Sequence, residues 1–275
     1  MNIRNDALTR LLTLTKRPQT VAGKKQDQVE STLLRMNKSL WYNGSGVATI
    51  NMVRDGVTSL SVFSAPCKNM DVNIPIASID AVLGILPYHG TEVNLSWSND
   101  KLEIRSRNKK TTLTSSFNAP AFGNCPDDMA QWGQKSLDRK LQLKWEGGYL
   151  ISNTGEWMKP KLSFTLDSSE LFEALRCDAI NGQKTNRFTF TYEADYVNVK
   201  VGSELKGATE TTFSLPDQML DAGEVTIEGG IDSVLKHYSG DVTLHFFDFS
   251  EYGQGTRILF SLPNGDMVFQ VGLLE

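Results

Sequence analysis

The chain has 275 residues, of which 40% are hydrophobic and 22% are charged. It is longer than the about 100 to 200 residues of a typical domain, which indicates two domains or one large one, and its composition excludes a disordered protein. No stretch approaches the about 20 apolar residues of a membrane helix. Arg4, Asp6 and Arg10 interrupt the region where a signal peptide needs an apolar core. We therefore expect a cytoplasmic globular protein rather than a membrane, secreted or collagen-like one.

Charge is distributed unevenly along the chain. Residues 1–160 contain 20 Lys and Arg against 14 Asp and Glu, whereas residues 161–275 contain 8 against 18. Such opposite charges suit an anionic partner for the basic part, or contact between the basic part of one copy and the acidic part of another.

Cysteine is scarce and scattered. Cys67, Cys125 and Cys177 form no CxxC pair, so the sequence indicates neither a disulfide framework nor a thiolate zinc site. We interpret each as a small hydrophobic residue in a protein of a reducing, intracellular compartment.

The N-terminal segment predicts a strand at Ile3 and a helix over residues 7–16, capped by Asn5 or Asp6. The helix places Leu8, Leu11 and Leu12 on one side. Alternating residues then predict strands over residues 32–41, 47–53 and 58–63.

Three later segments repeat this arrangement. In residues 72–83, 162–175 and 225–235 the apolar spacing changes from two to three or four at the same relative place, which is typical of a strand that leads into a helix. Asp167 is placed to cap the second of these helices, which has Leu171, Phe172 and Leu175 on its predicted buried face. Three alternating runs follow each junction: 92–97, 102–107 and 110–117; then 187–193, 196–201 and 208–215; then 241–249, 256–262 and 267–273.

The repeat predicts an α+β protein of two similar domains, residues 1–118 and 161–275. Each domain contains two βαβββ units, with helices on one side and antiparallel sheets on the other. Residues 119–160 have no clean period and form the expected connection between the domains, with some strand over 141–145 and 149–152.

The sequence shows no catalytic constellation. His89, His237 and His245 have no metal-ligand spacing and are interpreted as core or surface residues. The glycine-containing segments 43–46 and 253–255 match neither a nucleophile elbow nor a phosphate loop. We therefore expect a protein that is not an enzyme and that needs no metal or cofactor.

Two domains of paired βαβββ units resemble the DNA sliding clamps, the ring-shaped processivity factors of DNA polymerases. The most clamp-like stretches are residues 76–86 followed by 100–107, and 167–175 followed by 196–201; residues 82–86 are similar to clamps of large tailed phages. The resemblance implies a homotrimer that closes head to tail around double-stranded DNA without reading its sequence. It further implies peptide partners from the polymerase and the clamp loader and, for a phage protein, the cytoplasm of a bacterial host.

The resemblance also assigns roles to residues. Each cation on or after a helix has a simpler interpretation than DNA binding, namely an exposed side chain that interacts favourably with the helix dipole. The implied DNA-binding residues are Arg10, Lys16, Arg17, Arg176, Lys184, Arg187, Lys236 and His237. The implied subunit interface contains Lys109, Lys110, Thr111, Glu210, Thr211 and Phe213, with Glu204 on its acidic side. The implied partner-peptide site contains Leu273 and Leu274.

One feature departs from the clamp pattern, and three alternatives stay open. The second helix, residues 78–86, carries Asp80 and no Lys or Arg, so it contributes little positive charge, and DNA contact can shift to the segment 105–110. A β-rich viral structural or assembly protein would also lack catalytic residues. A damage-checkpoint clamp with different subunits would share the fold, and an enzyme of unknown type is the third alternative.

Overall fold

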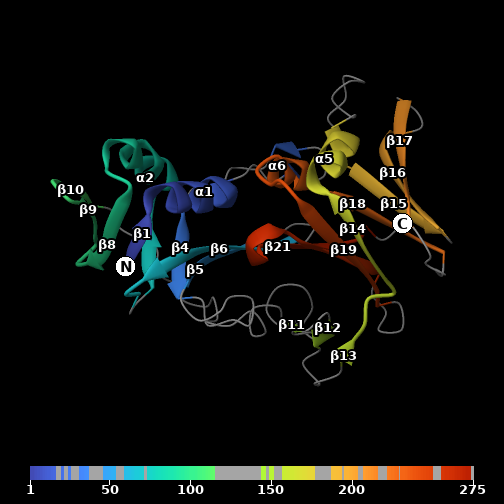
Figure 1. Ribbon diagram of the computed structural model, residues 1–275, viewed down its shortest axis with the longest axis horizontal. Helices are drawn as coiled ribbons and strands as arrows, with labels where there is room; N and C mark the ends of the chain where they lie inside the picture. The colour runs from blue at the N-terminus through green and yellow to red at the C-terminus, as the bar shows by residue number, and fades with distance from the viewer. Residues whose placement is uncertain are drawn as a thin grey trace. The chain divides into compact units, whose positions relative to one another are not determined.

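The computed structural model describes residues 1–16, 20–21, 24–25, 31–36, 46–53, 59–70, 73–114, 144–146, 149–151, 157–176, 187–193, 195–203, 207–215, 222–228, 230–249 and 255–273. The chain divides into two compact units (Figure 1). Unit 1 contains Met1–Arg17, Asp27–Asn51 and Ser61–Lys144, and unit 2 contains Pro18–Gln26, Met52–Leu60 and Trp145–Glu275. Because residues 115–143 lie outside the described part, the expected boundaries at 118 and 160 stay a prediction.

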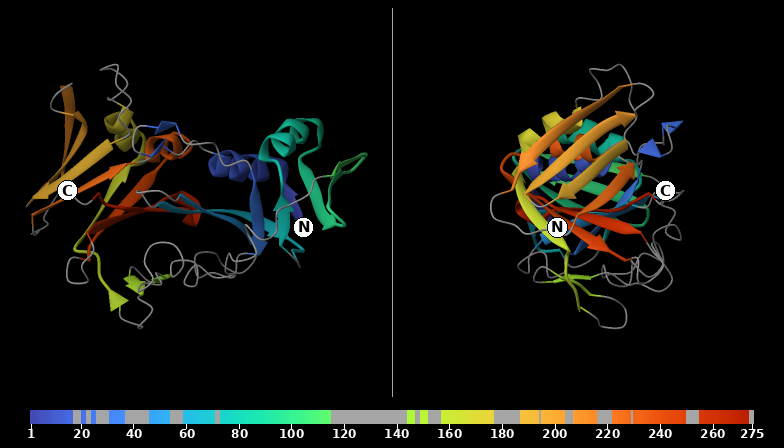
Figure 2. Two further views of the ribbon diagram at one scale, coloured as in Figure 1. Left: turned by 180° about the vertical axis from the view of Figure 1, so that it is seen from behind. Right: turned by 90° about the vertical axis from the view of Figure 1, so that its right-hand side faces the viewer.

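Unit 1 contains two helices and an antiparallel sheet in the order β10-β9-β8-β1-β6, to which β5, β4 and β7 are added in turn. The two helices lie on the same side of this sheet in the views of Figures 1 and 2. The helices are α1 (Asn5–Lys16) and α2 (Ile79–Ile85), followed by the 3₁₀ turn η1 (Leu86–Tyr88). The strands are β1 (Asn2–Arg4), β4 (Thr32–Met36), β5 (Gly46–Val53), β6 (Ser59–Lys68), β7 (Ile74–Ile76), β8 (Glu92–Ser98), β9 (Lys101–Ser106) and β10 (Lys109–Thr114).

The core of unit 1 follows from the predicted amphipathic pattern. Leu8, Leu11 and Leu12 are fully buried, as predicted, and α1 packs beside α2. Asn99 and Asp100 both have positive φ, at 51° and 57°, which gives the β8–β9 hairpin the turn that its twist favours.

Strand β6 extends five residues beyond the end of the predicted strand at residue 63 and contains Pro66. The strand nevertheless continues: Cys67 pairs with Ile3 and Lys68 with Asn2 of β1.

Unit 2 contains two four-stranded runs, β21-β20-β19-β14 and β17-β16-β15-β18, and two helices that pack beside each other. The helices are α5 (Ser168–Arg176) and α6 (Ile231–Leu235), and the turn between β20 and β21 is η4 (Pro263–Gly265). The strands are β14 (Leu162–Asp167), β15 (Arg187–Glu193), β16 (Tyr196–Ser203), β17 (Gly207–Ser214), β18 (Gly223–Glu228), β19 (Asp241–Asp248), β20 (Thr256–Ser261) and β21 (Met267–Val271).

Aromatic side chains join the two runs of unit 2. Phe246 on β19 stacks on Phe164 with 5.6 Å between the ring centroids. The same ring lies 6.0 Å from Phe190 and 5.1 Å from Tyr192 of β15. Aromatic rings at such distances add specific edge and stacking contacts to the burial of their apolar surface, so Phe246 is central to this core.

The predicted cap of α5 is confirmed, whereas one predicted core residue is not buried. Asp167 Oδ1 accepts hydrogen bonds from the backbone N–H groups of Ser169 at 2.8 Å and Glu170 at 3.4 Å. Leu171 and Leu175 are buried as predicted, but Phe172 is only half-buried and Ala174 takes the inner position. Residues 171, 174 and 175 share a helix face by their spacing, while residue 172 is rotated by about 100°.

Four βαβββ units follow one another along the chain, which confirms the predicted fold class. Each unit has a strand, a helix and three strands: β1-α1-β4-β5-β6, β7-α2-β8-β9-β10, β14-α5-β15-β16-β17 and β18-α6-β19-β20-β21. Two small sheets complete the described structure: the pair β2 (Thr20–Val21) and β3 (Lys24–Lys25), and the sheet of β11 (Lys144–Glu146), β12 (Tyr149–Ile151) and β13 (Trp157–Met158). The strands β2, β3 and β13 have no counterpart in the prediction.

Candidate nucleic-acid and subunit interfaces

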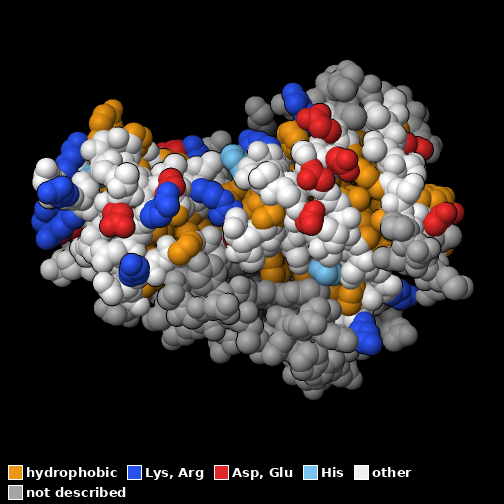
Figure 3. Space-filling model, viewed as in Figure 1, with side chains coloured by type: hydrophobic (Ala, Val, Ile, Leu, Met, Phe, Trp, Pro, Cys, Tyr) orange, Lys and Arg blue, Asp and Glu red, His pale blue; other side chains and the backbone are white. Residues whose placement is uncertain are grey.

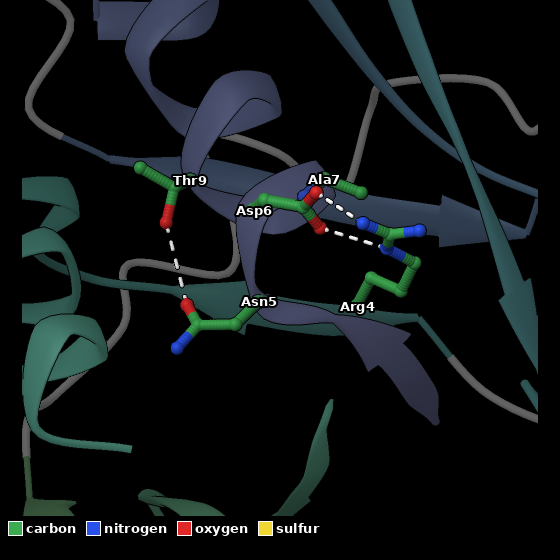
Figure 4. A network of polar contacts seen from close by, with 5 residues as sticks. All are labelled: Arg4, Asn5, Asp6, Ala7 and Thr9. Carbon is green, nitrogen blue, oxygen red and sulfur yellow. Dashed lines mark hydrogen bonds and ion pairs between the residues drawn. The ribbon is translucent and has the colours of Figure 1, made fainter. Parts of the chain in front are cut away.

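The start of α1 is fixed by two neighbouring polar side chains (Figure 4). The Arg4 guanidinium donates to both carboxylate oxygens of Asp6, at 3.0 and 2.6 Å, and Asp6 Oδ1 accepts from the Ala7 N–H at 2.9 Å. The Arg4 hydrogen bond lowers the pKa of the Asp6 carboxyl. This arrangement holds a negative charge at the positive end of the helix dipole.

The Asn5 side-chain oxygen accepts from the Thr9 hydroxyl at 3.4 Å, and its side-chain NH₂ group reaches the turn that follows α2. It donates to the carbonyl oxygens of Leu86 at 2.8 Å and Gly90 at 3.0 Å, and the Asn5 backbone N–H donates to Thr91 O at 2.8 Å. With a longer bond from the same NH₂ group to His89 O at 3.4 Å, four hydrogen bonds tie the turn after α2 to the start of α1.

Of the predicted DNA-binding cations of unit 1, Arg10 and Lys16 lie on α1, and Lys16 meets a carboxylate of α2. Arg10 is half-buried on α1. The Lys16 ammonium forms an ion pair with Asp80 of α2, whose side chain is 68% exposed. Arg17 lies outside the described residues. The acidic residue that distinguishes the second helix from the clamp pattern is thus the ion-pair partner of Lys16.

The predicted cations of unit 2 lie at the ends of elements. Arg176 is exposed in the last turn of α5; its guanidinium lies 3.8 Å from the Glu173 carboxylate and 5.9 Å from the Phe172 ring centroid. Arg187 begins β15, and Lys236 and His237 follow α6; all three are exposed. Lys184 lies outside the described residues.

Taken together, the helices carry nearly balanced charge. The four helices carry or adjoin the cations Arg10, Lys16, Arg176 and Lys236 and carry the carboxylates Asp6, Asp80, Glu170, Glu173 and Asp232. Acidic side chains gather around α5 in Figure 3, whereas Lys and Arg gather where β9 and β10 lie. This charge balance could have been predicted, because the acidic residues lie in or beside the helices expected from the sequence.

Several strands pair on one side only within the described residues, and in each unit one of them is the last strand of a βαβββ repeat. In unit 1 this strand is β10, which pairs with β9, and in unit 2 it is β17, which pairs with β16. An edge strand presents unpaired backbone N–H and C=O groups to another strand.

The register shows which side chains of the edge strands face the cores. Directly paired residues of antiparallel strands point to the same face. Thr111 and Leu113 pair with the buried Ile104 and Leu102, and Thr211 and Phe213 pair with the buried Val199 and Val197. All four edge residues are only half-buried, so each core face remains partly open at its edge.

The two edges differ in charge. On β10, the Lys110 ammonium lies 2.5 Å from Glu103, whose pKa is lowered by hydrogen bonds from Lys110 and Arg105, while Lys109 has no carboxylate partner among the described residues. On β17, Glu210 lies 3.8 Å from Lys200. Glu204 lies outside the described residues. The charged residues of β10 are thus basic, and the one charged residue of β17 is acidic.

The predicted peptide site is described only in part. Leu273 is half-buried, and its backbone N–H donates to Thr226 O of β18 at 2.7 Å; Gly272 N–H donates to Thr256 O at 2.8 Å. Leu274 lies outside the described residues. The chain after β21 is thus bonded to both runs of unit 2.

Two surveys concern the described residues alone. No described helix is long and apolar enough to cross a membrane. Nor do the described His, Cys, Asp and Glu side chains form a group of three or more that could hold a metal ion.

The chain is similar in structure to bacterial DNA polymerase clamps. No family model and no curated protein matches the sequence. The β subunit of the Streptococcus pyogenes DNA polymerase superposes with a TM-score of 0.63 at 10% identity, the Caulobacter crescentus β sliding clamp with 0.62 at 13%, and the Thermotoga maritima DNA polymerase III β subunit with 0.59 at 10%. These matches cover 100% of this chain but only 64 to 66% of the clamp chains. Over its whole length, the chain has the fold of the DNA sliding clamps.

Proposed function

We propose that the chain is a sliding clamp, a cytoplasmic, non-catalytic ring that encircles double-stranded DNA and tethers a DNA polymerase to it as a processivity factor. The observation that carries this proposal is the clamp fold, which extends over 100% of the chain. The repeated βαβββ units and the near-balanced helix surface agree with a protein that holds DNA by enclosure rather than by strong contact.

In this proposal three copies assemble head to tail. The β10 edge of one copy pairs with the β17 edge of the next, which satisfies the unpaired backbone groups of both strands. Lys109, Lys110 and Thr111 lie on the first edge, and Glu210, Thr211 and Phe213 lie on the second. The opposite charges favour this contact over contact between two like edges.

DNA contact in this proposal is weak and independent of sequence. Phosphate contacts position a protein on DNA without reading bases. The cations that would approach the duplex are those predicted from the clamp resemblance: Arg10, Lys16, Arg17, Arg176, Lys184, Arg187, Lys236 and His237. Because Lys16 and Arg176 already have carboxylate neighbours, each gains less from a phosphate than a free cation would.

Peptide partners from the polymerase and the clamp loader would bind near the C-terminal segment in unit 2. Leu273 and Leu274 are the proposed contact residues. A peptide that adds to a strand edge and buries two or three side chains is a common recognition mode.

Mass and retention on DNA test the function. Three copies of the 30.6 kDa chain give a particle of about 92 kDa, which light scattering after size-exclusion chromatography would detect. A closed ring, once loaded, stays on circular DNA and leaves when the DNA is linearised. A strictly monomeric protein at high micromolar concentration, or equal retention on both DNA forms, would contradict the proposal.

A charge reversal tests the proposed edges. Lys109→Glu combined with Lys110→Glu should weaken the oligomer at low salt, and addition of Glu210→Lys should restore part of its stability. Lys68→Glu changes an exposed cation on β6, with β1, β8 and β9 between it and β10, and serves as the control. If the double reversal assembles like the wild type, the edge contact is wrong.

A further inference from the structure

Tyr88 is the only large hydrophobic side chain that is strongly exposed among the described residues, at 71%. It lies in η1, the turn after α2, directly beside the edge strand β10. Single exposed apolar residues are common on protein surfaces. Tyr88 differs from such residues because it lies beside an edge strand and its turn is held by several hydrogen bonds.

The turn that carries Tyr88 is held from three directions. Leu86 is fully buried below it, and Asn5 donates to the Leu86 and Gly90 carbonyl oxygens. The His89 ring, itself buried, bonds through Nδ1 to Ser106 Oγ at 3.1 Å and through Nε2 to Thr111 Oγ1 at 3.0 Å. Tyr88 is thus held on a scaffold fixed to β9 and β10, although its own ring faces solvent.

Lys109 of β10 contacts both the backbone and the ring of Tyr88. Its ammonium donates to Tyr88 O at 3.3 Å and lies 5.2 Å from the centroid of the Tyr88 ring. Among the described residues it meets no carboxylate. A cation on an aromatic face is a weak contact at an exposed site and strengthens when both groups lose water.

The register of the edge strands β10 and β17 indicates which residue of a second copy would cover Tyr88 and Lys109. Lys109 pairs with Ser106 and therefore points to the core face of β10, as Thr111 and Leu113 do. Suppose that β17 of a second copy pairs antiparallel with β10, that the midpoints of the two strands are aligned, and that their core faces lie on the same side. Lys109 then lies opposite Phe213. Phe213 is the half-buried aromatic residue on the core face of β17.

We propose that Tyr88 and Lys109 form a preorganised anchor for a second copy of this chain and receive Phe213 of its β17 edge, which fixes the register of the subunit contact. This proposal rests on the proposed function, because it assumes the head-to-tail edge contact. Aromatic side chains are enriched among the residues that contribute most to the affinity of a contact, and preorganisation lowers the entropy lost on binding.

A double-mutant cycle on the full chain tests the anchor. Tyr88→Ala and Phe213→Ala should each raise the dissociation constant of the oligomer at least tenfold in a dilution series followed by sedimentation, whereas Tyr88→Phe should stay within threefold of the wild type. If the two rings touch, the double variant should be clearly less impaired than the product of the single effects predicts.

Matched controls separate the possible outcomes. Phe172→Ala removes a half-buried aromatic ring that is stacked by Arg176 on α5, and its effect should simply multiply with that of Tyr88→Ala. Thermal unfolding of each variant reports whether a loss of assembly is a loss of folding. The anchor is wrong if the wild type forms an oligomer and Tyr88→Ala does not change its dissociation constant. It is also wrong if the effects of Tyr88→Ala and Phe213→Ala simply multiply in the double variant. Either result leaves the clamp proposal standing. A monomeric wild type overturns both.

Discussion

Acid should weaken unit 2 through one buried histidine. His245 on β19 is 9% exposed and bonds through Nδ1 to Ser163 Oγ at 2.7 Å and through Nε2 to Ser261 Oγ at 3.1 Å. Burial lowers its pKa from 6.5 to about 4. The folded protein therefore keeps the ring neutral at pH values where the unfolded chain binds a proton.

The sign and size follow from this difference. The stabilisation is complete above the unfolded pKa of 6.5 and is lost as the pH falls from 6.5 to about 4. Each pKa unit corresponds to 1.36 kcal/mol, so the upper limit is about 3.4 kcal/mol. Since the ring retains some contact with water, we expect about 2 kcal/mol between pH 7.5 and pH 4.5.

The variant His245→Gln keeps a donor and an acceptor but cannot titrate. Urea unfolding at the two pH values should show that the variant loses about 2 kcal/mol less than the wild type on acidification. His237→Gln changes an exposed imidazole of the same unit and controls for the general effect of losing a histidine. An equal acid sensitivity of the wild type and His245→Gln would refute the reasoning.

Three further predictions concern the core, the helix cations and the C-terminal segment. Phe246→Ala should lower the free energy of unfolding by about 3–5 kcal/mol, because a fully buried ring in contact with three others is lost, whereas Phe172→Ala should cost less in the same urea titration. Deletion of residues 273–275 should abolish stimulation of the cognate polymerase in a primer-extension assay while the oligomer mass is kept; retained stimulation would contradict the peptide site. Simultaneous replacement of four helix cations by Ala should reduce loading on circular DNA without a change in mass, and unchanged loading would remove these cations from the DNA contact. These four are Arg10, Lys16, Arg176 and Lys236.

Most of the fold was predictable from the sequence because two periods alternate in a fixed order. The switch from alternating to helical spacing at 162–175 places β14 and α5 within a residue or two of the observed bounds. Local turn chemistry, such as Asn99 and Asp100 with positive φ, fixes the hairpins. The prediction failed where the local pattern did not reflect tertiary pairing: β6 continues past Pro66 because β1 lies beside it.

The candidate sites were less predictable, because they depend on which elements lie side by side. The sequence gives no sign that Lys16 meets Asp80, 64 positions away, or that Asn5 reaches the turn after α2. The pairing of Tyr88 with Phe213 in the proposed anchor shows the same limit, although the clamp resemblance implied Phe213 as an interface residue. Their importance depends on exposure and on strand register, and a single sequence reports neither.

The pairing of Lys16 with Asp80 yields a last prediction about DNA. A cation that must exchange a carboxylate for a phosphate gains little, and it releases fewer counterions than the slope of about 0.9 per phosphate contact assumes. Asp80→Asn should therefore raise the affinity for duplex DNA and steepen its salt dependence, because Lys16 becomes available. Asp241→Asn, which removes an exposed carboxylate on β19, makes the same change in net charge and should do neither. If both variants strengthen binding equally, the overall charge decides the affinity, and the pairing of Lys16 with Asp80 does not limit DNA contact.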